Sequence, residues 1–340
     1  MFHKKAVVLT LFVLLGVALT LTILAAAPST TSDAPTSIES LEKAALQGNP
    51  TAQLGLGLLY VNGHGVPKDY AMAKLWVEKA ALQGDAEAQY NLGWLYGNGQ
   101  GVAQDYATAK LWFEKAAQQG LAEAQYNLGL MYYYGHGVPK DYKMAKLWVE
   151  KAAQQGLAEA QYNLGVLYDK GHGVPQDYKM AKLWYEKAAQ QGNVMAQYNL
   201  GGLYYNGHGV PQDYATAKLW YEKAALQGNA EAQTYLGWLY DNGRGVPQDY
   251  KMAKLWYEKA ALQGNAEAQS NLGLLYAQGH GVPKDYKTAY AWLNVAAASG
   301  YQNAIKAREL IVSAMDASTL AEAQALSKIY LEKYGSKKSQ

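Results

Sequence analysis

A repeat of 36 residues constrains this chain of 340 residues more than any other feature of its sequence. Each copy ends in glycine and carries a tryptophan at a fixed place. The glycines are Gly48, Gly84, Gly120, Gly156, Gly192, Gly228, Gly264 and Gly300, and the tryptophans are Trp76, Trp112, Trp148, Trp184, Trp220, Trp256 and Trp292. A fixed period of this length is typical of a solenoid, in which each repeat buries its apolar face only against its neighbours. The sequence therefore predicts an all-α solenoid of seven stacked repeats over residues 49–300.

The second copy, residues 85–120, shows how one repeat is expected to fold. Apolar residues at helical spacing predict a first helix over Ala86–Tyr96 and a second helix over Tyr106–Gln119. Gly99 and Gly101 interrupt the chain between them, because glycine adopts positive φ without a steric clash. Each copy is therefore predicted to be a helix, a glycine loop, a helix and a glycine turn.

Individual residues of this copy have predicted structural roles. Asp105 is expected to cap the second helix, and Gly120 to end it. Gly93 lies inside the first helix, where glycine costs about 1 kcal/mol relative to alanine, so we expect the partner helix to approach it closely. The predicted apolar side of the second helix comprises Tyr106, Ala109, Leu111, Trp112 and Ala116.

Composition narrows the possible functions. The chain has 30 basic and 28 acidic residues, and this balance argues against nucleic acid, whose binding needs a basic stripe to displace counterions. The chain has no cysteine, which excludes disulfides, thiolate metal sites and a cysteine nucleophile.

The N-terminal end has the pattern of a targeting segment. Met1–Lys5 is basic, and Ala6–Ala27 carries no charge. Two interpretations of residues 1–27 remain open. A signal peptide would be cleaved, whereas an uncleaved anchor could span the hydrocarbon layer of about 30 Å. Either one places the repeats outside the cytoplasm. Residues 28–36 are interpreted as a linker, and residues 37–48 as a capping half-repeat.

Residues 301–340 are expected to close the stack with capping helices and a polar tail. Tyr301–Met315 begins like another first helix but lacks the central motif of the repeat. Thr319 and Glu322 form a capping-box pattern before a last helix, Leu320–Tyr334. A closing helix pair with a polar outer side is what the end of a solenoid requires.

One stripe along the first helices is the candidate partner-binding site. The positions of Trp94 and Asn98 change from copy to copy, and with Asn91 and its equivalents they lie at helical spacing on one face, away from the core. The candidates are Asn91, Trp94, Asn98, Asn127, Leu130, Tyr134, Asn163, Val166, Lys170, Asn199, Asn206, Tyr235, Trp238 and Asn242. We expect this stripe to line the groove of the solenoid, and we call it the first-helix stripe.

Two tryptophans on this stripe, Trp94 and Trp238, break the pattern of the seven others, which are assigned to the core. Exposed tryptophans would be anchors for a partner, since this residue is enriched in binding hot spots. Packing between repeats is the alternative interpretation. Aromatic side chains in a groove could also stack on a glycan.

Other patterns are interpreted as structural rather than chemical. His64, His136, His172, His208 and His280 share one loop position, and equivalent loops should lie roughly 8 to 10 Å apart, too far to share a zinc ion at ~2.0 Å. Ser40 and Lys43 match S-x-x-K of penicillin-recognising enzymes, but the other motifs of those enzymes are missing. The sequence therefore predicts no catalytic residue, metal site or cofactor.

The motif A-x-A-Q-x-x-L-G-x-x-Y-x-x-G-x-G-V-x-x-D-x-x-x-A-x-x-W resembles the Sel-one-like repeat, a relative of the tetratricopeptide repeat. In the second copy it comprises Ala86, Ala88, Gln89, Leu92, Gly93, Tyr96, Gly99, Gly101, Val102, Asp105, Ala109 and Trp112. The resemblance implies a right-handed α/α superhelix that acts as an adaptor between proteins, commonly exported in bacteria. Some members are cysteine-rich and bind penicillin, and this chain departs from them because it has no cysteine.

These observations favour a non-enzymatic scaffold, exported to the cell envelope, that binds a protein or peptide along its groove. A peptidoglycan-binding or β-lactam-binding envelope protein with weak hydrolase-like activity is the alternative. Contact with a membrane is expected only through residues 6–27, and the protein is expected in the periplasm, in the envelope or in the medium.

Overall fold

The computed structural model describes residues 38–335, which contain seventeen α-helices and no strand. The predicted all-α solenoid is confirmed. Helix contacts divide these residues into two compact units, one ending at Gln176 and the other beginning at Asp177. The predicted targeting segment and linker lie outside the described residues.

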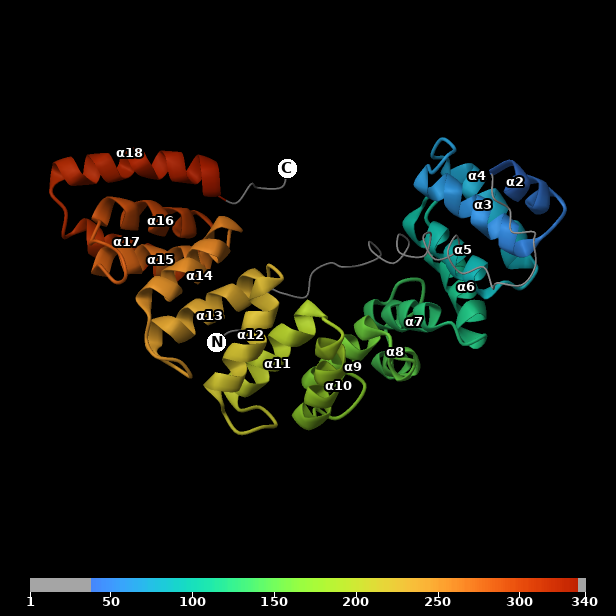
Figure 1. Ribbon diagram of the computed structural model, residues 1–340, viewed down its shortest axis with the longest axis horizontal. Coiled ribbons are helices and arrows are strands. Elements are labelled where there is room, and N and C mark those ends of the chain that lie inside the picture. The colour runs from blue at the N-terminus through green and yellow to red at the C-terminus, as the bar shows by residue number, and fades with distance from the viewer. Residues whose placement is uncertain (1–37, 336–340) are drawn as a thin grey trace. The chain divides into compact units, whose positions relative to one another are not determined.

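Each repeat is a pair of helices, and consecutive helices pack side by side along each unit (Figure 1). The first helices are α3 (Pro50–Asn62), α5 (Ala86–Asn98), α7 (Ala122–Tyr134), α9 (Ala158–Lys170), α11 (Val194–Asn206), α13 (Ala230–Asn242) and α15 (Ala266–Gln278). The second helices are α4 (Tyr70–Leu82), α6 (Tyr106–Gln118), α8 (Tyr142–Gln154), α10 (Tyr178–Gln190), α12 (Tyr214–Leu226), α14 (Tyr250–Leu262) and α16 (Tyr286–Ala298). Helix α2 (Ile38–Leu46) precedes them, and α17 (Gln302–Val312) and α18 (Ala317–Tyr334) follow.

Side-chain caps determine where most of these helices begin. The Asp105 carboxylate accepts hydrogen bonds from two backbone N–H groups of α6, at 2.9 and 3.1 Å, as predicted. The second helix of each of the seven repeats is capped by an aspartate in the same way. Asp85 caps the first helix α5, whereas Leu121 and Leu157 precede α7 and α9 without a side-chain cap. The caps satisfy N–H groups that a helix start otherwise leaves unpaired.

The two helices of a repeat approach most closely at the glycine inside the first helix. A Cβ atom on Gly93 would lie 2.9 Å from Cδ1 of Phe113 and 3.1 Å from the carbonyl oxygen of Ala109. The predicted close approach is therefore confirmed. Phe113 is fully buried but was absent from the predicted apolar side. The equivalent buried residues are Val77, Val149, Tyr185, Tyr221, Tyr257 and Leu293.

Leu111, in contrast, was predicted on the apolar side and is 55 % exposed. At about 100° per residue, a position two residues before the buried Phe113 points away from the core. The assignment of seven tryptophans to the core is correct for four, and Trp112, Trp148 and Trp220 are half-buried. Part of the Trp112 ring is covered by the Lys115 ammonium, 4.2 Å from its centroid.

Neighbouring repeats are joined through the glycine loops. A Cβ atom on Gly101 would lie 2.1 Å from the carbonyl oxygen of Tyr70 in the preceding repeat, so only glycine fits there. In four other copies the residue before the equivalent glycine is a histidine that stacks on a tyrosine of the preceding repeat. Centroid distances are 4.9 Å for Tyr106 and His136, 4.3 Å for Tyr142 and His172, 4.7 Å for Tyr178 and His208, and 4.2 Å for Tyr250 and His280. The loop histidines therefore act in packing between repeats.

A second set of contacts between repeats is formed by glutamines. Gln89 is buried, and its Nε2 donates to the carbonyl oxygen of Ala81 at 3.3 Å. Gln119 donates from Nε2 to Oε1 of Gln89 at 2.8 Å and to the carbonyl oxygen of Gly84 at 2.9 Å. Gln119 caps the end of α6 and Gly84 follows α4, so these bonds hold the ends of successive second helices next to each other.

At the C-terminal end, α18 packs against α16. The Trp292 ring lies 5.0 Å from both Tyr330 and Tyr334, and Asn294 donates to the Ser327 hydroxyl at 2.6 Å. These contacts cover the outer side of the last repeat. No helix in residues 38–335 has the length and apolarity of a membrane span.

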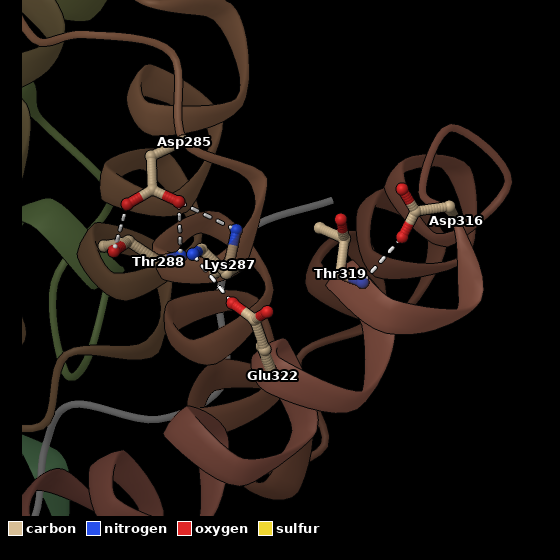
Figure 2. Close-up of polar contacts among 6 residues, drawn as sticks. All are labelled: Asp285, Lys287, Thr288, Asp316, Thr319 and Glu322. Carbon is tan, nitrogen blue, oxygen red and sulfur yellow. Dashed lines mark hydrogen bonds and ion pairs between the residues drawn. The ribbon is translucent and has the colours of Figure 1, made fainter.

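The start of α18 differs from its prediction. Asp316, not Thr319, caps the helix, and its carboxylate accepts from the Thr319 N–H at 2.7 Å (Figure 2). The predicted partner in the capping box, Glu322, instead forms an ion pair with Lys287 of α16 at 2.9 Å (Figure 2). The capping box was wrong because the helix begins three residues earlier, at Ala317.

Candidate partner-binding face

The structure places the first-helix stripe between core and solvent rather than fully outside. Tyr134, Lys170, Asn206 and Asn242 are exposed. Half-buried residues of the stripe are Asn91, Trp94, Asn98, Leu130, Asn163, Asn199, Tyr235 and Trp238. Two candidates do not reach solvent, since Asn127 is 7 % exposed and Val166 is 9 % exposed. A partner at this stripe would meet mainly half-buried side chains and four exposed ones.

Asparagines near the start of the first helices bond between repeats. Asn127 donates to the Tyr90 hydroxyl at 3.3 Å, and Asn163 donates to the Tyr126 hydroxyl at 2.8 Å. Burial raises the pKa of Tyr90 to about 12, and burial also raises the pKa of Tyr126, so both hydroxyls stay neutral at pH 7. This explains why Asn127 is buried, and it gives these residues a packing role that the sequence pattern did not indicate.

Asparagines at the other end of the first helices are oriented by their own helix. Nδ2 of Asn98 donates to the carbonyl oxygen of Trp94 at 2.9 Å, and Nδ2 of Asn242 donates to that of Trp238 at 2.9 Å. Asn206 makes the same bond to Gly202 at 2.8 Å. Because the amide nitrogen is held, the carbonyl oxygen of each side chain is presented in a fixed direction as an acceptor.

Tyr133, next to the exposed Tyr134, belongs to an aromatic group in the first unit. Its ring lies 5.0 Å from Tyr134 and 5.1 Å from Tyr142, and its hydroxyl lies 3.2 Å from Nδ1 of His172. Burial lowers the pKa of His172, with Lys140 and Lys170 adding to the effect, so the imidazole is neutral at pH 7. The group combines an aromatic surface with nearby lysines.

Trp238 belongs to a larger aromatic group in the second unit. Tyr205 lies 5.4 Å from Trp238, 5.3 Å from Tyr235 and 5.3 Å from Tyr214. Trp238 packs against core residues and remains half-buried. Trp238 therefore packs against the core, as the alternative interpretation expected, and its role as an anchor for a partner stays a prediction.

Glutamates in the first turn of the first helices give this face an acidic edge. Burial raises the pKa of Glu87, and the neighbouring Asp85 and Glu123 raise it further. Burial also raises the pKa of Glu267 in the second unit. Carboxylates that are partly desolvated in this way gain from a cationic group placed beside them.

The side chains considered above for metal binding or catalysis can be located within residues 38–335. No group of three or more histidine, aspartate or glutamate side chains there is placed to hold a metal ion. Ser40 and Lys43 lie on α2, where Lys43 is exposed. The recurring glutamates pair with the lysine four residues before them, as in Lys74 and Glu78 at 2.7 Å, and form surface ion pairs.

Comparison with known proteins places these features in a family. The model of the Sel1 repeat matches seven consecutive segments, residues 50–85, 86–121, 122–157, 158–193, 194–229, 230–265 and 266–301. A Sel1 repeat protein from Oxalobacter formigenes is 41% identical, with 81% of this chain and 79% of that chain covered and a TM-score of 0.66. The protein c5321, a protective antigen present in uropathogenic Escherichia coli strains, is 31% identical, with 91% of this chain and 89% of that chain covered and a TM-score of 0.55. A search of curated proteins finds no significant match.

The fold and the repeat contacts thus define an α-solenoid of helix pairs, a class typical of protein–protein interaction scaffolds. The chain belongs to the Sel1 repeat family. The resemblance found in the sequence is therefore confirmed.

Proposed function

We propose that this protein is a non-enzymatic scaffold, exported from the cytoplasm, that binds a protein partner along the first-helix stripe. The observation that carries the proposal is the contrast between positions. Packing residues such as Ala88, Leu92 and Gly93 recur unchanged in every copy, whereas the stripe position of Trp94, Leu130 and Trp238 differs from copy to copy. Different side chains at this position would give each repeat its own contact with a partner.

The chemistry of the stripe supports a polypeptide partner. Half-buried Trp94 and Trp238 offer apolar contact, and oriented amides at Asn98 and Asn242 offer hydrogen-bond acceptors. Aromatic anchors surrounded by polar groups are the usual composition of binding hot spots. The acidic edge at Glu87 favours a partner segment that carries lysine or arginine.

Site-specific photo-crosslinking tests the partner site. A photoreactive residue at Asn98 or Asn242 should capture the same partner protein in intact cells. The matched control is Lys223, an exposed residue on the second helix α12. Equal capture from all three positions, or none from the stripe, would refute this site.

Substitution gives a second test. Circular dichroism first shows that all three variants are folded. Trp94→Ala and Trp238→Ala should then each reduce the amount of crosslinked partner that is recovered. Trp220→Ala, a substitution on a second helix, should not reduce it. Undiminished recovery from the double variant W94A/W238A would contradict a role for these rings.

Export rests on the basic and apolar pattern of residues 1–27 and has its own experiment. Fractionation of cells that produce the full chain should place it outside the cytoplasm, and N-terminal sequencing should distinguish cleavage from an anchor. A protein found only in the cytoplasm with Met1–Lys5 intact would contradict export.

A further inference from the structure

The second helices present a surface of a different kind from the first-helix stripe. Six second helices, α4, α6, α8, α10, α12 and α14, share four exposed positions at spacing i, i+4, i+8 and i+11. This spacing places the four side chains in one line along the helix. In the first unit these positions are Ala71, Leu75, Lys79, Leu82, Ala107, Leu111, Lys115, Gln118, Lys143, Leu147, Lys151 and Gln154. In the second unit they are Lys179, Leu183, Lys187, Gln190, Ala215, Leu219, Lys223, Leu226, Lys251, Leu255, Lys259 and Leu262. We call these residues the outer stripe.

The composition of the outer stripe is narrow. The first unit has four leucines and four lysines among its twelve positions, the second unit has five of each, and neither has an acidic residue. The leucines are strongly exposed, from 41 % at Leu147 to 72 % at Leu226. The outer stripe is therefore both cationic and apolar, although the basic and acidic residues of the whole chain are nearly equal in number.

Ion pairs do not neutralise this surface. The glutamates beside it, such as Glu78, pair with lysines outside the outer stripe, such as Lys74. The stripe lysine Lys79 places its ammonium 4.3 Å from the Trp76 ring centroid and forms no ion pair within residues 38–335. A lysine lying along an apolar helix surface can extend its ammonium toward an anionic layer while its methylenes stay in apolar contact.

The last repeat shows what the same line of positions looks like when protein covers it. On α16 the line is Lys287, Ala291, Val295 and Ala298, and where α18 packs on α16 its two middle residues are buried while Ala298 stays exposed. Ala291 and Val295 stand where the other copies have leucine and lysine, and they are 0 % and 2 % exposed. Protein contact at this surface thus goes with small apolar residues, whereas the uncovered copies keep the Leu and Lys pattern typical of helices that lie in a membrane interface.

We propose that the outer stripe binds the surface of a lipid bilayer that contains anionic phospholipid. The leucines enter the boundary between headgroups and acyl chains, and the lysines contact the headgroup phosphates. The glutamine bonds between successive helix ends, as from Gln119 to Gly84, set the stripes of neighbouring repeats next to each other, so their contributions add. This extends the expectation from sequence, which allowed membrane contact only through residues 6–27.

A local probe separates this contact from any insertion of the N-terminal segment. The chain has no cysteine, so a single Leu111→Cys in the full chain can carry an environment-sensitive fluorophore. Vesicles of phosphatidylcholine with phosphatidylglycerol should shift its emission to the blue, and pure phosphatidylcholine vesicles should do so much less. The same fluorophore at Asn98→Cys, on a first helix, should not respond. Equal emission at Leu111 with and without anionic vesicles would overturn the proposal.

Charge substitution gives the matched test. The variant K79Q/K115Q removes two stripe lysines, and K68Q/K140Q removes two exposed loop lysines with the same change in net charge. K79Q/K115Q should lower the affinity for vesicles, measured with the Leu111 probe, by roughly fivefold per lysine. Added salt should lower this affinity further. K68Q/K140Q should have little effect on it. Equal loss in both variants would indicate an effect of net charge alone and refute the stripe. A probe that responds to an acidic amphipathic helical peptide but not to vesicles would also refute it, in favour of a protein occupant.

Discussion

At the residue scale, two glycines of one helix differ in how much space surrounds their Cα atoms. Gly201 and Gly202 are neighbours in α11, yet only the first faces α12. A Cβ atom on Gly201 would lie 2.7 Å from Cδ1 of the fully buried Tyr221, whereas a Cβ atom on Gly202 meets only the Tyr221 hydroxyl, at 3.8 Å. One position excludes a side chain for lack of space, and the other accepts one.

This pair gives a stability prediction with its own control. Gly201→Ala should lower the free energy of unfolding by about 1 to 3 kcal/mol, because the methyl group overpacks a ring that cannot move away. Gly202→Ala should leave stability unchanged or raise it by up to about 1 kcal/mol, because alanine favours the helix. Denaturant unfolding followed by circular dichroism compares them. The same loss in both variants would show that crowding at Tyr221 is not the cause.

A second prediction at this scale concerns the cap of α12. The Thr216 hydroxyl donates to the Asp213 carboxylate at 2.6 Å. This hydrogen bond lowers the pKa of Asp213, and the hydrogen bonds from the backbone N–H groups of Thr216 and Ala215 lower it further. A lowered folded pKa means that the cap stabilises the protein fully above the unfolded pKa of about 3.9 and loses its effect as pH falls through the folded value.

Thr216→Val removes the hydroxyl and keeps the shape, so the carboxyl should titrate at higher pH and the cap should be lost earlier on acidification. Carbon-13 NMR of the Asp213 carboxyl measures this directly. An unchanged midpoint in T216V would show that the hydroxyl does not set the pKa.

At the scale of elements, α18 is the helix least like the repeats, and its contact with α16 depends on small side chains. Ala323 is 0 % exposed at this contact, whereas Ala325 lies on the exposed side. Ala323→Leu should therefore displace α18 at a cost of about 1 to 3 kcal/mol, while Ala325→Leu should not. Hydrogen exchange of the α18 amides is the measurement. Slow exchange retained in A323L would contradict tight packing at this helix.

Elements inside the repeat were predictable from the sequence, and the exceptions have physical reasons. Asp105 and Gly120 each determine local backbone structure, so their roles could be inferred without knowledge of distant contacts. The cost of a glycine inside a helix indicated the close approach at Gly93. Leu111 was assigned to the core because leucine is usually buried, and only the position of Phe113 shows which side of the helix faces inward.

The candidate site was predictable to a lesser degree. Periodicity placed Asn127 on the first-helix stripe, but its bond to the Tyr90 hydroxyl comes from a neighbouring repeat and cannot be inferred from spacing within one helix. The cap of α18, Asp316, was missed because Thr319 and Glu322 matched a capping box, whereas Glu322 forms an ion pair with Lys287 on another helix.

At the scale of the whole molecule, the contacts between the seven repeats in the described residues join each repeat to the next one in sequence. Loop glycines, stacked histidines and the glutamine bonds each join one repeat to the next, as Gly101 to Tyr70 and Gln119 to Gln89 show. A solenoid stabilised in this way has a stability that is close to a sum of repeat and interface terms, so a local defect should spread only a short distance.

The Gly201→Ala variant tests this property as well as packing. Hydrogen exchange should speed up in α11, α12 and the helices that contact them, while α3 and α4, four repeats earlier, should keep their protection, because the energy of their contacts does not depend on the fifth repeat. Gly202→Ala provides the reference for the effect of an added methyl group. A uniform loss of protection from α3 to α16 in G201A would show instead that the chain unfolds as one cooperative block, and that contacts beyond nearest neighbours contribute much of its stability.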